Sequence, residues 1–261
     1  MPLSRPSNAM FALVMTASLS VAPRAMAAGT DQCADAPTPA LHIFACTAVI
    51  EDGMPNSPNV EIAYINRGLA YFATNDSQKA IADFDQALAL SPQDVNAYEA
   101  RAIVFASKHD YAEAIADDRK AIDLDPLSTR AYNNLANAYK AQGNLQDALA
   151  SYERAISLSP NEPTLYFNRG NTLRALGRAK DAIQDYDHAI ALNSNFLNAY
   201  IARGNARVAN GDFENANADF DRVLAIDPMN NAAIVNKIAL QKLRDGSGHP
   251  GTQQPIVTTV K

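Results

Sequence analysis

The sequence predicts an all-α fold of five consecutive helix-turn-helix units, and three series of residues support this prediction. Tyrosines recur every 34 residues: Tyr64, Tyr98, Tyr132, Tyr166 and Tyr200. Alanines recur at the same spacing: Ala80, Ala114, Ala148, Ala182 and Ala216. Prolines close four of the units: Pro92, Pro126, Pro160 and Pro228. Ser194 takes the equivalent place in the remaining unit. Repetition at this period indicates one supersecondary motif stacked on copies of itself.

The elements of a unit follow from its residue types, counted from Glu61 as place 1. The first helix has a small residue at place 8: Gly68, Ala102, Ala136, Gly170 and Gly204. We expect place 8 to face the alanine at place 20 of the second helix, and the tyrosine at place 4 to pack beside the residue at place 24. The turn at place 15 holds residues that tolerate a positive φ: Asn75, His109, Gly143, Gly177 and Gly211. Proline at place 32 is expected to stop the second helix.

This pattern resembles the tetratricopeptide repeat, a helix-turn-helix unit of 34 residues. The resemblance covers five units: 61–94, 95–128, 129–162, 163–196 and 197–230. It implies a right-handed α-solenoid, in which a unit buries its apolar face by stacking on its neighbours. We expect residues 28–60 to form an N-terminal cap with a half-repeat, whose helix covers residues 40–51, and residues 231–243 to form a capping helix. Residues 244–261 are rich in Gly, Pro and polar types and are predicted to be a disordered tail.

The first residues have the composition of an export signal. Arg5 precedes an apolar run at residues 9–22, and Ala25 and Ala27 supply small residues before a cleavage point. This pattern predicts a signal peptide over residues 1–27. An uncleaved membrane anchor is the alternative, although the run is short for a bilayer span. Export and the family resemblance together imply a periplasmic location.

The chain has two cysteines, Cys33 and Cys46, and both follow the predicted signal peptide. In an oxidising compartment they can form a disulfide that closes a loop with 12 residues between them. Such a disulfide would stabilise the cap by about 3 kcal/mol. Two free thiols are the alternative.

Four units pair an arginine at place 7 with an aspartate at place 23. The arginines are Arg67, Arg101, Arg169 and Arg203, and the aspartates are Asp83, Asp117, Asp185 and Asp219. Unit three changes both places together, to Leu135 and Ser151. We therefore predict structural ion pairs between the two helices of a unit, near the seam with the next unit, because a partly buried guanidinium needs a partner.

Composition and motifs narrow the function classes. The net charge of -6 and the absence of a basic run argue against nucleic-acid binding. The sequence shows no phosphate-binding loop, nucleophile elbow or zinc motif, and its four histidines are isolated, so no enzyme activity, metal or cofactor is predicted. The resemblance implies a non-catalytic scaffold that binds a partner protein or an extended peptide in a concave groove lined by first helices. The alternatives are an accessory subunit of an envelope enzyme and a structural solenoid that associates with itself.

The groove residues are expected at places 2, 5, 6, 9, 12 and 13 of the first helices. Asparagines recur at places 6 and 9: Asn66, Asn134, Asn137, Asn168, Asn171 and Asn205. Basic residues accompany them at places 2 and 12: Arg130, Lys140 and Arg174. An asparagine can donate to and accept from an extended backbone, and the basic residues would favour an acidic segment or a free carboxylate. We predict that such a peptide lies across units three to five; solvated helix surface is the alternative for the asparagines.

Overall fold

The computed structural model describes residues 33, 35–53 and 58–245. The predicted signal peptide and residues 246–261 of the predicted tail lie outside the described residues. The described part is all-α and contains no strand. The first helices of the units are α3 (Pro58–Ala73), α5 (Val95–Ser107), α7 (Thr129–Gln142), α9 (Pro163–Ala175) and α11 (Leu197–Ala209). The second helices are α4 (Ser77–Leu90), α6 (Tyr111–Leu124), α8 (Leu145–Leu158), α10 (Ala179–Leu192) and α12 (Phe213–Ile226). The chain also has α2 (Pro39–Asp52) before them and α13 (Asn231–Arg244) after them.

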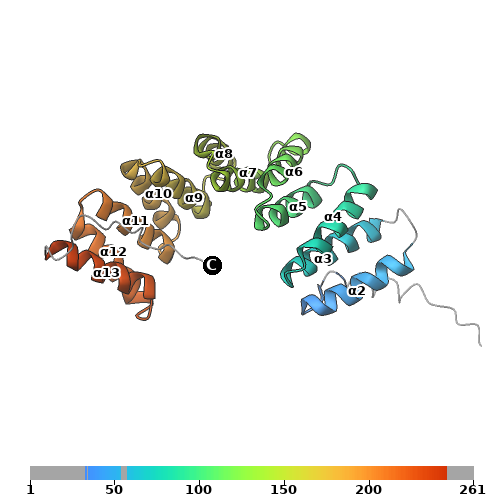
Figure 1. Cartoon of the computed structure of the whole chain (residues 1–261), viewed down its shortest axis with the longest axis horizontal. Helices are drawn as coiled ribbons and strands as arrows, with labels where there is room; N and C mark the ends of the chain where they lie inside the picture. The colour runs from blue at the N-terminus through green and yellow to red at the C-terminus, as the bar shows by residue number, and fades with distance from the viewer. Residues whose placement is uncertain (1–32, 34, 54–57, 246–261) are drawn as a thin grey trace, which may run out of the picture.

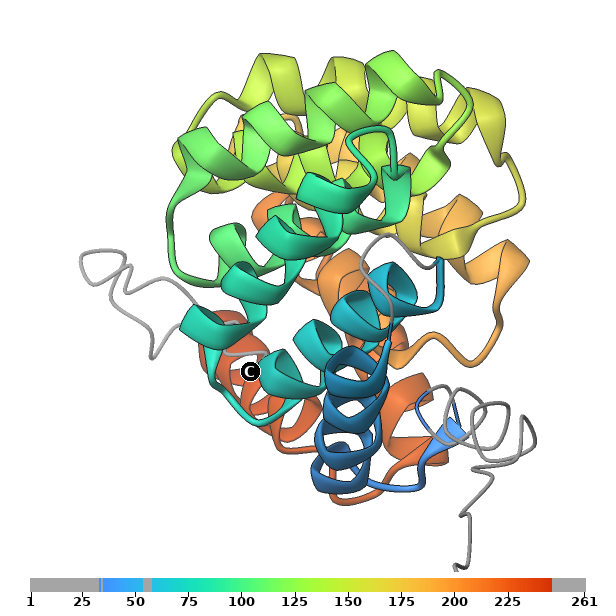
Figure 2. The same cartoon turned by 90° about the vertical axis from the view of Figure 1, so that its right-hand side faces the viewer.

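The helices form a solenoid that curves into an arch. In the middle of the arch, α5, α7 and α9 line the inner side and α6, α8 and α10 the outer side (Figure 1). Each helix packs on the helices before and after it, and neighbouring first helices also touch one another. Figure 2 looks at the same arch from its N-terminal end, with α2 in front. The all-α solenoid predicted from the sequence is confirmed.

The turns and caps explain why the units repeat so regularly. All five residues at place 15 have a positive φ, and two of them are not glycine: Asn75 at 62° and His109 at 66°. Acidic or hydroxyl side chains begin several helices, as Asp94 does when it accepts a hydrogen bond from the backbone N–H of Ala97 at 2.8 Å. α10 ends at Leu192, the same place as the other second helices, although its unit has Ser194 instead of proline. Proline at place 32 is therefore not required to end the helix.

The core between the two helices of a unit contains a close contact that the sequence analysis did not predict. A Cβ on Gly170 would meet the ring of Tyr186 at 2.8 Å, and one on Gly68 would meet Phe84 at 2.9 Å. The small residue at place 8 therefore makes room for the aromatic ring at place 24. In unit one it also faces the alanine at place 20 as expected, since a Cβ on Gly68 would lie 3.2 Å from the backbone oxygen of Ala80. The rings of Tyr186 and Phe84 are fully buried.

Candidate functional site

An arginine and an aspartate form a bidentate ion pair at the centre of four units. In unit four, Arg169 donates from Nε and Nη2 to the two carboxylate oxygens of Asp185, at 2.8 and 2.6 Å. The pairs Arg67–Asp83, Arg101–Asp117 and Arg203–Asp219 repeat this contact. The four aspartates are buried, and the hydrogen bonds that Arg67 donates to Asp83 raise the pKa of Arg67 above its ordinary value. These arginines are held inside the protein and are not free to bind a ligand.

The arginines also reach across a seam between units, in the direction opposite to the expected one. Arg101 donates from Nη1 to Asp85 of the preceding unit at 2.5 Å, and Arg203 donates in the same way to Asp187 at 2.6 Å. Both acceptors lie at place 25 of the preceding second helix. In unit three, where Leu135 replaces the arginine, the preceding place 25 is Arg119. Places 7 and 23 of unit three and place 25 of the preceding unit thus change together. This joint change in the sequence could have shown that the arginine contacts the preceding unit.

The tyrosine at place 4 lies under the same guanidinium. The Arg169 guanidinium carbon is 5.8 Å from the ring centroid of Tyr166, and that of Arg203 is 5.3 Å from the ring of Tyr200. At this distance the ring face attracts the cation. The tyrosine series on which the fold prediction rested therefore supports the ion pairs, a role that the sequence analysis missed.

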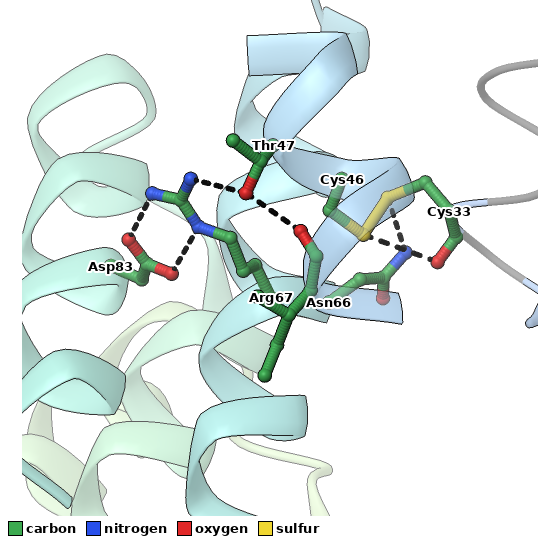
Figure 3. Close-up of a disulfide and its surroundings, with 7 residues drawn as sticks. Cys33, Cys46, Thr47, Asn66, Arg67 and Asp83 are labelled. Atoms are coloured by element: carbon green, nitrogen blue, oxygen red, sulfur yellow. Dashed lines mark hydrogen bonds and ion pairs between the residues drawn. A yellow bond between two sulfur atoms is a disulfide. The ribbon is translucent and has the colours of Figure 1, made fainter. Parts of the chain in front are cut away.

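The N-terminal cap brings Cys33 and Cys46 to disulfide distance, with their Sγ atoms 2.15 Å apart (Figure 3). Two polar residues of α3 join the cap to unit one. Asn66 directs its Nδ2 to Cys33 Sγ at 3.9 Å, and Arg67 donates to Thr47 Oγ1 at 3.0 Å (Figure 3). Asn66, predicted to bind a peptide, thus contacts the cap.

Units three and four have a repeated pair of side chains. The Tyr152 hydroxyl donates to Asn137 Oδ1 at 2.6 Å, and the Tyr186 hydroxyl donates to Asn171 Oδ1 at 2.9 Å. In each pair a second helix orients an amide on the first helix of the same unit. The tyrosine hydroxyl uses one lone pair of the amide oxygen and orients the amide, which leaves the amide nitrogen as a donor for a ligand.

Two cations lie one turn further along the same helices. Lys140 on α7 lies 3.5 Å from Asn137 Oδ1 through its Nζ, and burial lowers the pKa of its ammonium group. Arg174 takes the equivalent place on α9 and interacts with Tyr186, whose pKa is raised to about 12 chiefly by burial. Neither cation forms an ion pair with a carboxylate of the described residues.

The other predicted site residues are engaged or covered. Arg130 donates to the buried carboxylate of Glu99 and, at 2.7 Å, to Asn96. Asn168 donates to Asn133 Oδ1 at 3.3 Å. Asn134 and Asn205 have buried amide atoms without a hydrogen-bond partner. The structure therefore groups four of the nine residues, namely Asn137, Lys140, Asn171 and Arg174, as groups that a ligand could use.

The described residues contain no group of three or more His, Cys, Asp or Glu side chains arranged to hold a metal ion. Among them there is also no helix with the length and hydropathy needed to cross a bilayer.

Family models match most of the repeat region. Two models described as tetratricopeptide repeat match residues 65–129 and 119–150, a third matches 197–230, and one described as TPR repeat matches 136–177 and 170–211. The chain belongs to the tetratricopeptide repeat (TPR) family. A comparison with curated proteins finds no match.

Solved TPR structures share the fold. The chain is similar to MamA, with 25% identity and a TM-score of 0.56 over 60% of this chain and 92% of that one. It is also similar to YrrB, described as a TPR protein with an unusual peptide-binding site, with 23% identity and a TM-score of 0.58 over 74% and 97% of the two chains. Pseudomonas aeruginosa pilF gives 22% identity and a TM-score of 0.63 over 72% and 85%.

Proposed function

We propose that this TPR protein is a non-catalytic interaction scaffold that holds an extended segment of a partner protein against the inner face of units three and four. The observation that carries the proposal is the pair of cations without a carboxylate partner, Lys140 and Arg174, beside two amides with engaged oxygens, Asn137 and Asn171. YrrB, which shares the fold, is described as having a peptide-binding site, and this supports a peptide as the kind of ligand.

The chemistry favours a carboxylate on the ligand. Burial penalises the charged form of Lys140, and a carboxylate beside it would offset that penalty and form a charge-assisted hydrogen bond. Arg174 could bind such a group through two parallel N–H donors. The amide nitrogens of Asn137 and Asn171 would then donate to backbone carbonyls of the same peptide. We propose an acidic side chain or a C-terminal carboxylate as the group held at the cations.

We further propose that the scaffold works after export, in the periplasm. The signal-peptide pattern of residues 1–27 and the Cys33–Cys46 pair support this location. Intact mass of the protein isolated from cells tests it, since cleavage would remove residues 1–27.

The binding test uses fluorescein-labelled acidic decapeptides with a free C-terminus, and the same peptides with an amidated C-terminus or with amides in place of their acids. We expect the combined change Lys140→Ala and Arg174→Ala to weaken binding at least about tenfold, or 1.4 kcal/mol. The matched control replaces two exposed cations of outer helices, Lys180→Ala and Arg222→Ala, and leaves binding intact.

A second pair of variants separates charge from fold. Asn137→Asp and Asn171→Asp keep an acceptor for each tyrosine hydroxyl but remove the amide donor and add a negative charge. We expect these variants to melt close to the wild-type temperature and to lose the acidic peptides. If the cation variants bind every peptide as well as the wild type does, the inner face of units three and four is not the binding site.

A further inference from the structure

The C-terminal helix α13 has the pattern of a first helix, but no second helix follows it in the described residues. Place 8 is buried in all five units because the second helix of the unit covers it. The equivalent residue of α13 is Ile238, which is 53% exposed. Val235, one turn earlier, is 52% exposed, and Lys242 lies one turn later on the same side. We call Val235, Ile238 and Lys242 the α13 stripe.

The opposite end of the solenoid has a second apolar stripe. On α2, Ala45 and Cys46 are buried, while Leu41 and Phe44 are 49% and 75% exposed. By the 34-residue spacing, Phe44 corresponds to place 18, which in the five units holds a polar residue or alanine: Gln78, Ala112, Gln146, Lys180 and Glu214. We call Leu41, Phe44, Ala48 and Glu51 the α2 stripe.

The two stripes have opposite charge. α13 carries Lys242 and Arg244 in its last turn and no acidic residue, while its Lys237 is paired with Asp221 of α12. α2 carries Glu51 and Asp52 in its last turn and no lysine or arginine. Carboxylates in the last turn of a helix face the negative end of its dipole, so a cation from another chain would relieve an unfavourable contact.

We propose that the α2 stripe of one copy of this protein packs on the α13 stripe of a second copy, so that copies associate head to tail. A parallel arrangement of the two helices sets Leu41 and Phe44 against Val235 and Ile238, because both pairs have the same spacing of three residues. It also brings the acidic last turn of α2 to the basic last turn of α13. The contact uses different surfaces on the two copies, so it is heterologous and can continue into rings or filaments.

This association is independent of the proposed peptide binding, because neither stripe contains a residue of the inner face of units three and four. It places the peptide faces of successive copies at regular intervals along one assembly. A partner with several acidic segments would then be held with an increased effective concentration.

The test measures the mass of the purified chain by sedimentation equilibrium over a range of concentrations. We expect the wild-type mass to rise with concentration, and the variants Phe44→Asp and Ile238→Asp each to remain a single chain. Both residues are exposed, so the variants should keep the wild-type melting temperature. Gln146→Asp, an acidic change at place 18 of unit three, is the matched control and should associate as the wild type does.

The decisive experiment mixes the two variants in equal amounts. Phe44→Asp retains the α13 stripe and Ile238→Asp retains the α2 stripe, so the mixture should form complexes of two chains and none larger. A wild-type chain that stays monomeric, or a mixture that forms no pair, overturns the proposal. A chain ending at residue 245 that associates while the full chain does not would also overturn it, because the tail would then be the occupant of the α13 stripe.

Discussion

Units two and four share the ion pair between their two helices but bury different residues at place 24. Both have the ion pair between places 7 and 23, as Arg101–Asp117 and Arg169–Asp185. At place 24, however, unit four buries Tyr186, whose hydroxyl reaches Asn171. Unit two instead buries Asp118, and one of its carboxylate oxygens has no hydrogen-bond partner.

The difference shows that a unit with this ion pair tolerates a buried carboxylate, Asp118, at place 24. Burial, followed by the nearby charges of Glu99 and Asp117, raises the pKa of Asp118 to about 8. Glu99 is itself 1% exposed and is neutralised by Arg130 of the next unit, with Ser128 donating to it at 2.5 Å. Unit two therefore depends on unit three for its charge balance, whereas unit four satisfies its centre with its own residues.

The largest loss of stability should come from breaking the ion pair that the two units share. Arg169→Leu leaves the buried carboxylate of Asp185 without its partner, and we expect the free energy of unfolding to fall by about 3 kcal/mol. Urea unfolding followed by circular dichroism measures this change.

The rescue variant copies unit three. Adding Asp185→Ser should recover most of the loss, because Ser151 at that place satisfies its hydroxyl by donating to the backbone carbonyl of Asp147 at 2.9 Å. Asp185→Tyr, with an aromatic residue at place 23, should also recover much of it. If the losses of the two single variants simply add in the double variant, the two side chains do not stabilise each other.

A gain in stability that depends on pH should distinguish unit two. The folded chain keeps Asp118 protonated up to about pH 8, whereas the unfolded chain releases the proton near pH 4. Stability from this group is therefore present at low pH and is lost as the pH rises through this range. We expect Asp118→Asn to match the wild type near pH 4 and to be more stable by about 5 kcal/mol at pH 9, since each of the roughly four pKa units between the folded and the unfolded chain corresponds to about 1.4 kcal/mol.

The equivalent change in unit four is a control, since Tyr186→Phe should not alter the pH dependence between pH 4 and pH 9. A constant stability difference between Asp118→Asn and the wild type over this range would show that Asp118 does not titrate as described.

The smallest effect should come from the tyrosine hydroxyls. Tyr186→Phe removes the bond to Asn171 and should cost about 1 kcal/mol. Unit five already has this combination, because Phe220 stands at place 24 and both amide atoms of the buried Asn205 lack a partner. Phe220→Tyr should therefore stabilise the chain by a similar amount. Equal melting temperatures for all three proteins would mean that water satisfies these amides.

Most of the fold could be predicted because particular residue types recur at a fixed spacing. The 34-residue series located all ten repeat helices, the positive-φ turns and the capping helix, since each needs a particular residue type at a fixed place. The paired change of Leu135 and Ser151 located the ion pairs, because a buried charge and its partner must change together.

The candidate site was predicted less completely. The spacing of Asn137 and Asn171 placed them on one face, but their orientation depends on hydroxyls from another helix, Tyr152 and Tyr186. Arg130 was predicted to be a ligand-binding cation because its partner, Glu99, lies 31 residues away, a separation that differs from the repeat spacing. The sequence placed the arginines at the seam with the next unit, whereas they reach the preceding unit. This prediction was wrong because the contact depends on how far a guanidinium extends between units. Contacts between units depend on the angle at which they stack, which residue types at single places do not determine.

The linear order of contacts between helices affects the order in which the solenoid unfolds. Among the described helices, each contacts only the helices before and after it, and each first helix also contacts the adjacent first helices, so no contact between these helices joins the two halves of the arch. Unzipping can then begin at an end without disturbing the middle. The Cys33–Cys46 disulfide closes a loop inside the N-terminal cap, and Arg67 joins that cap to unit one through Thr47. At the other end, α13 is joined to unit five by Lys237 and Asp221 and has one covered side. We therefore expect fraying to start at the C-terminal end, so that a pulling force or a protease would take the solenoid apart from unit five towards unit one.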